Sequence, residues 1–205
     1  MKGSQVMQSL PADYEVQKTF DLSKNIRLAV LMNLVGLVLF FAFGWLMLIV
    51  ARAIRPDAAF GRIELALNLA DLIPALVLLI GFMGLIFLML TLHEGLHGLF
   101  FWAFTGARPQ FGFKGVYAYT AASDWYLSRL PYVVVALAPL VFLTALGVAA
   151  LWVVPASWIL PLLLLVTLNA SGAIGDILIS FWTLWLPKDA LIQDFGDGVS
   201  VYVGP

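Results

Sequence analysis

The chain has 205 residues, a net charge of −1 and no cysteine; 62% of its residues are hydrophobic and 11% are charged. Soluble globular chains carry roughly 25% charged residues, so this composition indicates an integral membrane protein. The charge gives no reason to expect nucleic-acid binding, and without cysteine the chain forms neither disulfides nor cysteine metal sites.

The chain opens with a polar segment of mixed charge, residues 1–27, which we interpret as an N-terminal cytoplasmic tail and not as a removable signal peptide. A helix needs roughly 20 apolar residues to cross a bilayer. Four segments qualify: 28–51, 72–102, 131–154 and 158–186. The predicted fold class is an all-α integral membrane protein with about four transmembrane helices in one domain, 28–186. The cytoplasmic C-terminal tail, 187–205, is expected to belong to the same domain.

The second and fourth spans are longer than a bilayer requires, so we expect each to tilt, protrude or break. In the second span, bends are expected near Pro74, Gly81 and Gly84. In the fourth span, small residues predict a loosened helix at Ser171, Gly172 and Gly175.

The basic residues predict an orientation. Eight of the eleven Lys and Arg residues lie in the N-terminal tail, in the loop between the second and third spans, or in the C-terminal tail. The other three, Arg52, Arg55 and Arg62, lie on the opposite side. Because cytoplasmic loops carry the excess of Lys and Arg, both termini are expected in the cytoplasm.

Two stretches outside the spans are typical of strands. "RPQFGFKGVYAYTA" (108–121) is punctuated by glycine and rich in aromatic residues, and "DFGDGVSVYV" (194–203) has a Gly-containing turn followed by alternating residues. They predict a small cytoplasmic-side β-hairpin or sheet, with the strand-like loop over 106–121.

Both histidines of the chain lie in the second span, in the sequence His93-Glu94-Gly95-Leu96-His97. This fits the H-E-x-x-H pattern, in which residues four apart share one helix face and two imidazoles bind one zinc ion. Glu94 is then placed to act as general base toward a water at the metal. The alternative is a structural polar cluster. This alternative must explain why a carboxylate lies at membrane depth, where inserting a charged side chain costs at least about 2.5–3.5 kcal/mol of free energy. We therefore favour a metal site.

A third protein ligand is needed, and Asp176 is the only other acidic residue within a span. With about 1.5 Å of rise per residue, Asp176 and His93 lie at similar depth, about 15 and 14 Å from the inner ends of their spans. The alternative for Asp176 is a polar packing residue paired with Asn169 or Ser171. Asp124 and Asp194, in cytoplasmic segments, are alternative ligands.

These residues resemble the site-2 protease clan of intramembrane zinc metalloproteases, and are most similar to a bacterial membrane family labelled putative zincin peptidases. The resemblance covers residues 70–205. It rests on "HEGLHG", "FGFKGVYAY", "LAPL" (137–140), "SGAIGD" and "QDFGDGVSVY". It implies a multi-pass protein of the bacterial cytoplasmic membrane.

The resemblance also implies residue roles. Asp176 matches the aspartate that is the third zinc ligand of the clan, although the clan's "LDG" is "GDI" here. Asn169 is the nearest match to an Asn that helps hold the scissile carbonyl; its alternative role is a hydrogen bond between helices. A membrane-associated strand of the clan pairs with substrate backbone. The matching candidates for substrate binding are Phe111, Gly112, Val116, Tyr117 and Tyr119, whose alternative is an interfacial hairpin with aromatic anchors.

The sequence therefore predicts a zinc-dependent intramembrane peptidase with one Zn²⁺ per chain, acting on membrane-embedded or membrane-adjacent peptides. A second enzymatic reading is metal-assisted hydrolysis of another membrane substrate. The non-enzymatic alternative is a metal-binding membrane protein, either a structural zinc site or a metal carrier. The sequence predicts no oligomeric state.

Overall fold

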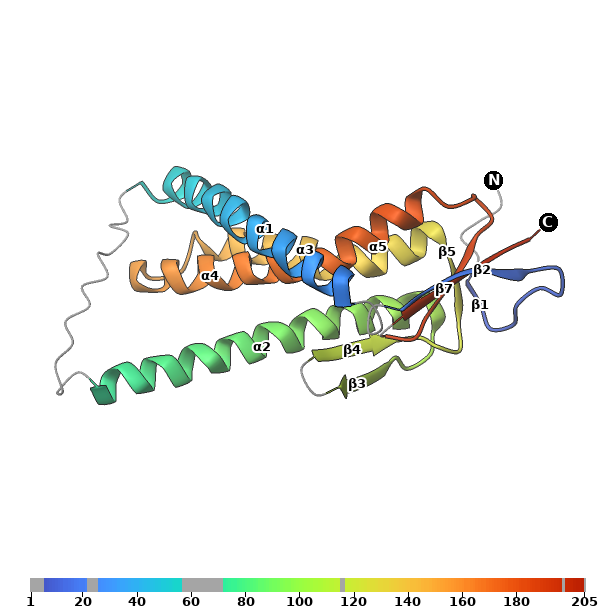
Figure 1. Ribbon diagram of the computed structural model, residues 1–205. Helices are drawn as coiled ribbons and strands as arrows, with labels where there is room; N and C mark the ends of the chain where they lie inside the picture. The colour runs from blue at the N-terminus through green and yellow to red at the C-terminus, as the bar shows by residue number, and fades with distance from the viewer. Residues whose placement is uncertain (1–5, 22–25, 57–71, 115–116, 197, 205) are drawn as a thin grey trace.

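The computed structural model describes residues 6–21, 26–56, 72–114, 117–196 and 198–204. The helices are α1 (Ile26–Ile54), α2 (Leu72–Thr105), α3 (Arg129–Ala150), α4 (Ala156–Gly172) and α5 (Ile174–Leu184). The strands are β1 (Val6–Met7), β2 (Glu15–Asp21), β3 (Gln110–Lys114), β4 (Tyr117–Ala121), β5 (Tyr126–Ser128), β6 (Leu191–Asp194) and β7 (Gly198–Val203). All strands gather at one end of the helices, including β1 and β7, the first and last elements of the chain (Figure 1).

The predicted number of apolar helices is confirmed. Among the described residues, α1, α2 and α3 are each long and apolar enough to cross a membrane, and the bent pair α4 and α5 makes a fourth candidate span. Helix α2 runs unbroken from Leu72 to Thr105, so the proline and glycines near its start do not end it.

The fourth span is broken where small residues predicted a loosened helix. Helix α4 ends at Gly172, α5 begins at Ile174, and the two are bent by 42°. Ala173 joins them, with its N–H bonded to the Asn169 carbonyl at 3.0 Å and its own carbonyl accepting from Ile177 at 2.9 Å. The break places Asp176 in the first turn of α5.

The outer face of α2 has no protein cover in the described part of the chain. None of its most apolar 18-residue window is buried, and Ile73, Leu78 and Phe87 are all more than 70% exposed. Soluble monomers rarely expose so large an apolar surface, so this face suits lipid.

The sheet is larger than the sequence predicted. Five antiparallel strands lie in the order β1-β5-β6-β7-β2, and β3 with β4 forms a separate hairpin. Describing the fold as all-α is therefore incomplete, and the segment interpreted as an N-terminal tail supplies two strands. The pairing of β2 with β7 runs from Glu15 opposite Val203 to Asp21 opposite Gly198. Strands β1 and β5 are too short to show an alternating pattern, and β2 carries the charges typical of an edge strand.

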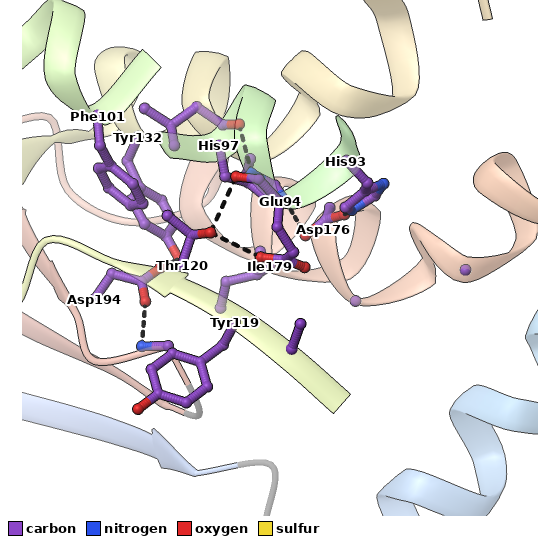
Figure 2. A pocket seen from close by; sticks show the side chains of 16 residues that line it. His93, Glu94, His97, Phe101, Tyr119, Thr120, Tyr132, Asp176, Ile179 and Asp194 are labelled. Carbon is purple, nitrogen blue, oxygen red and sulfur yellow. Dashed lines mark hydrogen bonds and ion pairs between the residues drawn. The ribbon is translucent and has the colours of Figure 1, made fainter. Parts of the chain in front are cut away.

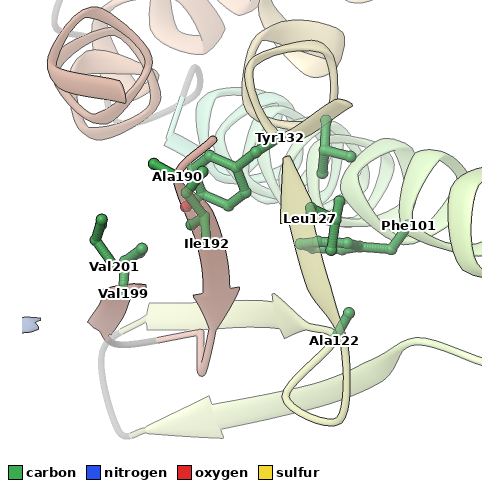
Figure 3. Packing of buried hydrophobic residues seen from close by; sticks show 9 residues of the cluster. Phe101, Ala122, Leu127, Tyr132, Ala190, Ile192, Val199 and Val201 are labelled. Atoms are coloured by element: carbon green, nitrogen blue, oxygen red, sulfur yellow. The ribbon is translucent and has the colours of Figure 1, made fainter. Parts of the chain in front are cut away.

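One cluster of buried side chains fixes the sheet to the helices (Figure 3). Phe101 of α2 and Tyr132 of α3 pack with Leu127, Ile192 and Val201 from three strands, and all five are at most 3% exposed. Because Phe101 follows His97 by about one helical turn, this packing holds the sheet next to the two histidines.

Candidate active site

His93, Glu94 and His97 lie on one side of the last third of α2, facing Asp176 (Figure 2). The two imidazole rings have centroids 5.0 Å apart, and each side chain is 12% exposed. The pair is therefore shielded from bulk water without being sealed from it.

The ring of His93 is oriented by Asn169 of α4. The Asn169 Oδ1 lies 2.9 Å from His93 Nδ1, and the Asn169 amide nitrogen donates to the carbonyl of Pro139 at 3.4 Å. With the amide nitrogen turned to Pro139, the oxygen faces the histidine, so His93 Nδ1–H donates. The Nε2 lone pair of His93 is then left for a metal.

The ring of His97 is oriented by the backbone of α3. Its Nδ1 donates to the Val135 carbonyl at 3.0 Å. Within a helix, this carbonyl would accept from the N–H four residues later, but that residue is Pro139, which has none. Pro139 in "LAPL" thus leaves the Val135 carbonyl free to accept a hydrogen bond from His97. The other ring nitrogen of His97, Nε2, faces Asp176.

Asp176 completes a three-residue cluster. Its Oδ2 lies 3.3 Å from His93 Nε2 and its Oδ1 lies 3.5 Å from His97 Nε2. Ligand atoms at about 2.0–2.1 Å from a tetrahedral zinc ion lie about 3.4 Å apart, so the spacing suits zinc. Two imidazoles held by their Nδ1 atoms and one carboxylate are also ligand types that zinc accepts. The residues present therefore fit the metal.

No other group of three or more potential ligands occurs in the described part of the chain. Three protein ligands are typical of catalytic zinc sites, which keep a fourth position for water or substrate, whereas structural sites are closed by four.

Glu94 points into the same space and is held from the β3–β4 hairpin. The Thr120 hydroxyl lies 2.9 Å from Glu94 Oε2 and 3.0 Å from the Glu94 carbonyl oxygen, and both are acceptors for its single proton. Because Thr120 donates to Oε2, the other carboxylate oxygen of Glu94, Oε1, receives no hydrogen bond from Thr120. Strand β4 thereby fixes the carboxylate beside the histidines.

These side chains line a cavity of about 300 Å³, which Thr120, Tyr119 and Tyr132 also border. Asn169 does not line it. In this structure Asn169 contacts the ring of His93, and its predicted role toward a scissile carbonyl stays a prediction.

Of the hairpin residues predicted to bind substrate, Tyr119 borders the cavity and Phe111 does not. Tyr119 lines the cavity, and its ring fills the space beside Gly112 and Gly196, where any side chain would collide with it. Phe111 is 62% exposed, with its ring edge against Gly98 of α2. Tyr117 is placed by its backbone pairing with Lys114, and Val116 lies outside the described residues.

The two alternative ligands have other partners. Asp124 accepts a hydrogen bond from Gln110 at 3.2 Å on the surface. Asp194 accepts from the Tyr132 hydroxyl at 2.8 Å and from the Gly196 N–H at 2.7 Å. Burial raises the pKa of Asp194 to about 6, against the opposing effect of these two bonds. Neither aspartate belongs to the three-residue cluster.

Three interactions of the candidate site were not predicted from the sequence. They are the hydrogen bond from His97 to the Val135 carbonyl, the one from Thr120 to Glu94 and the one from Tyr132 to Asp194. Only the first had a sequence signal, since a proline inside a predicted helix leaves one carbonyl without its donor. Thr120 is one polar residue within a strand-like stretch, which carries no such signal.

Two histidines and an aspartate that meet beside a glutamate, among apolar helices, are the residue types of a zinc metallopeptidase site. The family model described as "Putative zincin peptidase" matches residues 86–191, from the middle of α2 to the start of β6. The chain belongs to this family. Comparison with curated proteins and with solved structures gives no match.

The hydrogen bond between Asn169 and His93 predicts that Asn169 supports zinc binding by orienting the His93 ring. Replacing Asn169 by Ala removes the acceptor for His93 Nδ1, and loss of such an outer partner weakens zinc binding by about 10–100-fold. The dissociation constant for zinc, measured by competition with a chromogenic chelator, checks this. Ser171→Ala is the matched control, because the Ser171 hydroxyl donates to the Leu168 carbonyl of its own helix at 3.1 Å and its loss should leave zinc affinity unchanged. Unchanged affinity in Asn169→Ala would contradict the orienting role.

Proposed function

We propose that the protein is a zinc-dependent intramembrane peptidase that hydrolyses peptide bonds of membrane-embedded or membrane-adjacent substrates, with one zinc ion per chain. One observation carries the proposal: His93, His97 and Asp176 form a three-ligand cluster beside Glu94 within apolar helices. The family points to the same chemistry.

His93, His97 and Asp176 would hold the metal, with both rings fixed by their Nδ1 hydrogen bonds. When bound, zinc supplies Lewis acidity that polarises a carbonyl and makes water a better nucleophile. Glu94 accepts the proton of the attacking water and then delivers it to the leaving nitrogen. Thr120 is a positioning residue, because its hydrogen bond to Oε2 fixes the Glu94 carboxylate and leaves Oε1 to accept the proton.

Strand β4 is the proposed docking edge for the substrate backbone. Ala118, Tyr119 and Thr120 of β4 border the cavity, and in the described residues β4 has one strand neighbour, β3. A peptide bond inside a substrate helix is accessible only after its hydrogen bonds are broken. Pairing with a strand edge would replace those bonds.

We place both termini and the sheet in the cytoplasm, in a multi-pass protein of the bacterial cytoplasmic membrane. The distribution of Lys and Arg supports this orientation, and the first and last strands, β1 and β7, lie at the same end of the helices (Figure 1). Cleavage would then occur toward the cytoplasmic side of the bilayer.

Removal of the metal tests the function. The purified protein in lipid vesicles is expected to cleave members of a set of single-span membrane peptides, with products identified by mass spectrometry. Dialysis against a zinc chelator should abolish cleavage, and added Zn²⁺ should restore it. Cleavage that persists after complete zinc removal would contradict the proposal.

A further inference from the structure

A second cavity adjoins the candidate active site on the side away from the β3–β4 hairpin. Its volume is about 340 Å³, within the roughly 300–1,000 Å³ range of small-ligand sites. Its wall is mainly apolar and is supplied by β2, α1, α5 and β7, including Phe20, Leu28, Met32, Leu178 and Trp182.

The two cavities share part of their walls. Asp176 and Ile179 border both, as does the Tyr132–Asp194 pair. The second cavity therefore lies directly beside the candidate zinc ligands, and Asp176 is common to both.

The side wall of this cavity is built by the N-terminal strand. The rings of Phe20 and Trp182 have centroids 5.9 Å apart, and Lys18 Nζ lies 5.7 Å from the centroid of the Trp182 ring. Across the cavity, α1 comes close to α5, since a side-chain carbon at Gly175 would lie 3.5 Å from Met32 Cε. Both β2 and α1 lie outside the residues that match the family.

We propose that this cavity is the specificity pocket for a large apolar side chain next to the scissile bond. This inference rests on the proposed peptidase function, and it adds which substrate side chain the enzyme prefers next to the scissile bond. Most of the cavity wall is apolar, although Lys18, Asp176 and Asp194 also border it, so burial in the cavity favours an apolar side chain. Residues of β2 and α1 would then set the size of the side chain accepted, with Met32 lying against Gly175, next to the proposed zinc ligand Asp176.

The test compares two zinc-directed probes on purified, zinc-loaded protein: acetohydroxamate, and 3-phenylpropanohydroxamate, which adds a phenyl group. Dissociation constants are measured by isothermal titration calorimetry. Burial of the phenyl group should tighten binding by about 10–100-fold in the wild type. Met32→Trp puts a larger side chain into the cavity wall and should reduce this preference to within about twofold.

Two further variants keep the test decisive. Leu34→Trp adds the same side chain to α1 at an exposed position outside the cavity and should keep the full preference. Met32→Ala enlarges the cavity and should favour a naphthyl hydroxamate over the phenyl compound. If both Met32 variants kept the wild-type preferences, the cavity would belong to lipid or another occupant and the pocket assignment would be wrong. If acetohydroxamate itself did not bind, the proposed zinc site would fail, and the pocket assignment with it.

Discussion

Glu94→Gln is expected to retain zinc at the wild-type level and to lose peptide hydrolysis by about 10²–10⁴-fold, the usual contribution of a general base. Glutamine keeps the shape of the side chain and can still accept the hydrogen bond from Thr120. It cannot accept a proton from water at neutral pH. The variant therefore separates metal binding from catalysis at one position.

The measurement is zinc content by elemental analysis, together with the rate of cleavage of an established substrate peptide in vesicles. Glu15→Gln is the matched control, because Glu15 is exposed on β2 and its replacement should change neither quantity. Wild-type cleavage by Glu94→Gln would show that another group acts as the base. Loss of zinc would show instead that Glu94 is a ligand.

His93→Ala, His97→Ala and Asp176→Ala are each expected to lower zinc affinity by more than the roughly 10–100-fold that follows loss of an outer partner. Each removes one of three atoms that lie within 4.8 Å of one another. Two remaining protein ligands do not complete a tetrahedral site. Hydrolysis should fall with zinc content, and added zinc should restore it only partly.

Asp124→Ala is the matched control for Asp176→Ala. Asp124 is another aspartate, but it bonds to Gln110 on the surface and lies outside the cluster, so its variant should bind zinc like the wild type. Zinc affinity is measured by chelator competition and protein folding by thermal unfolding. If Asp176→Ala bound zinc normally, a different residue would have to be the third ligand.

The N-terminal segment matters for this site, although the family model does not cover it. Strand β2 pairs along β7, whose neighbour β6 ends at Asp194, and Asp194 borders both cavities. A fragment limited to the matching residues would lack this wall. The two proposals thus assign the zinc site to the matching residues and part of the side-chain preference to residues outside them.

The sequence by itself determined the features that depend on local composition. Runs of 20 or more apolar residues predict spans because the bilayer thickness sets the length of a helix. The spacing of His93 and His97 predicts a shared face because the helical period is 3.6 residues. The rise per residue also put Asp176 at the depth of His93, and the small residues before it marked the break that the structure shows.

The tertiary structure decided which groups meet across helices and strands. Helix α2 is apolar on all sides, so its sequence pattern does not define which face turns inward. Only packing brings Asn169 and the Val135 carbonyl to the two histidines, and Thr120 to Glu94. The N-terminal strand was missed for a related reason. An edge strand that carries several charges gains its stability from pairing with β7, 177 to 188 residues away, and not from a pattern of its own.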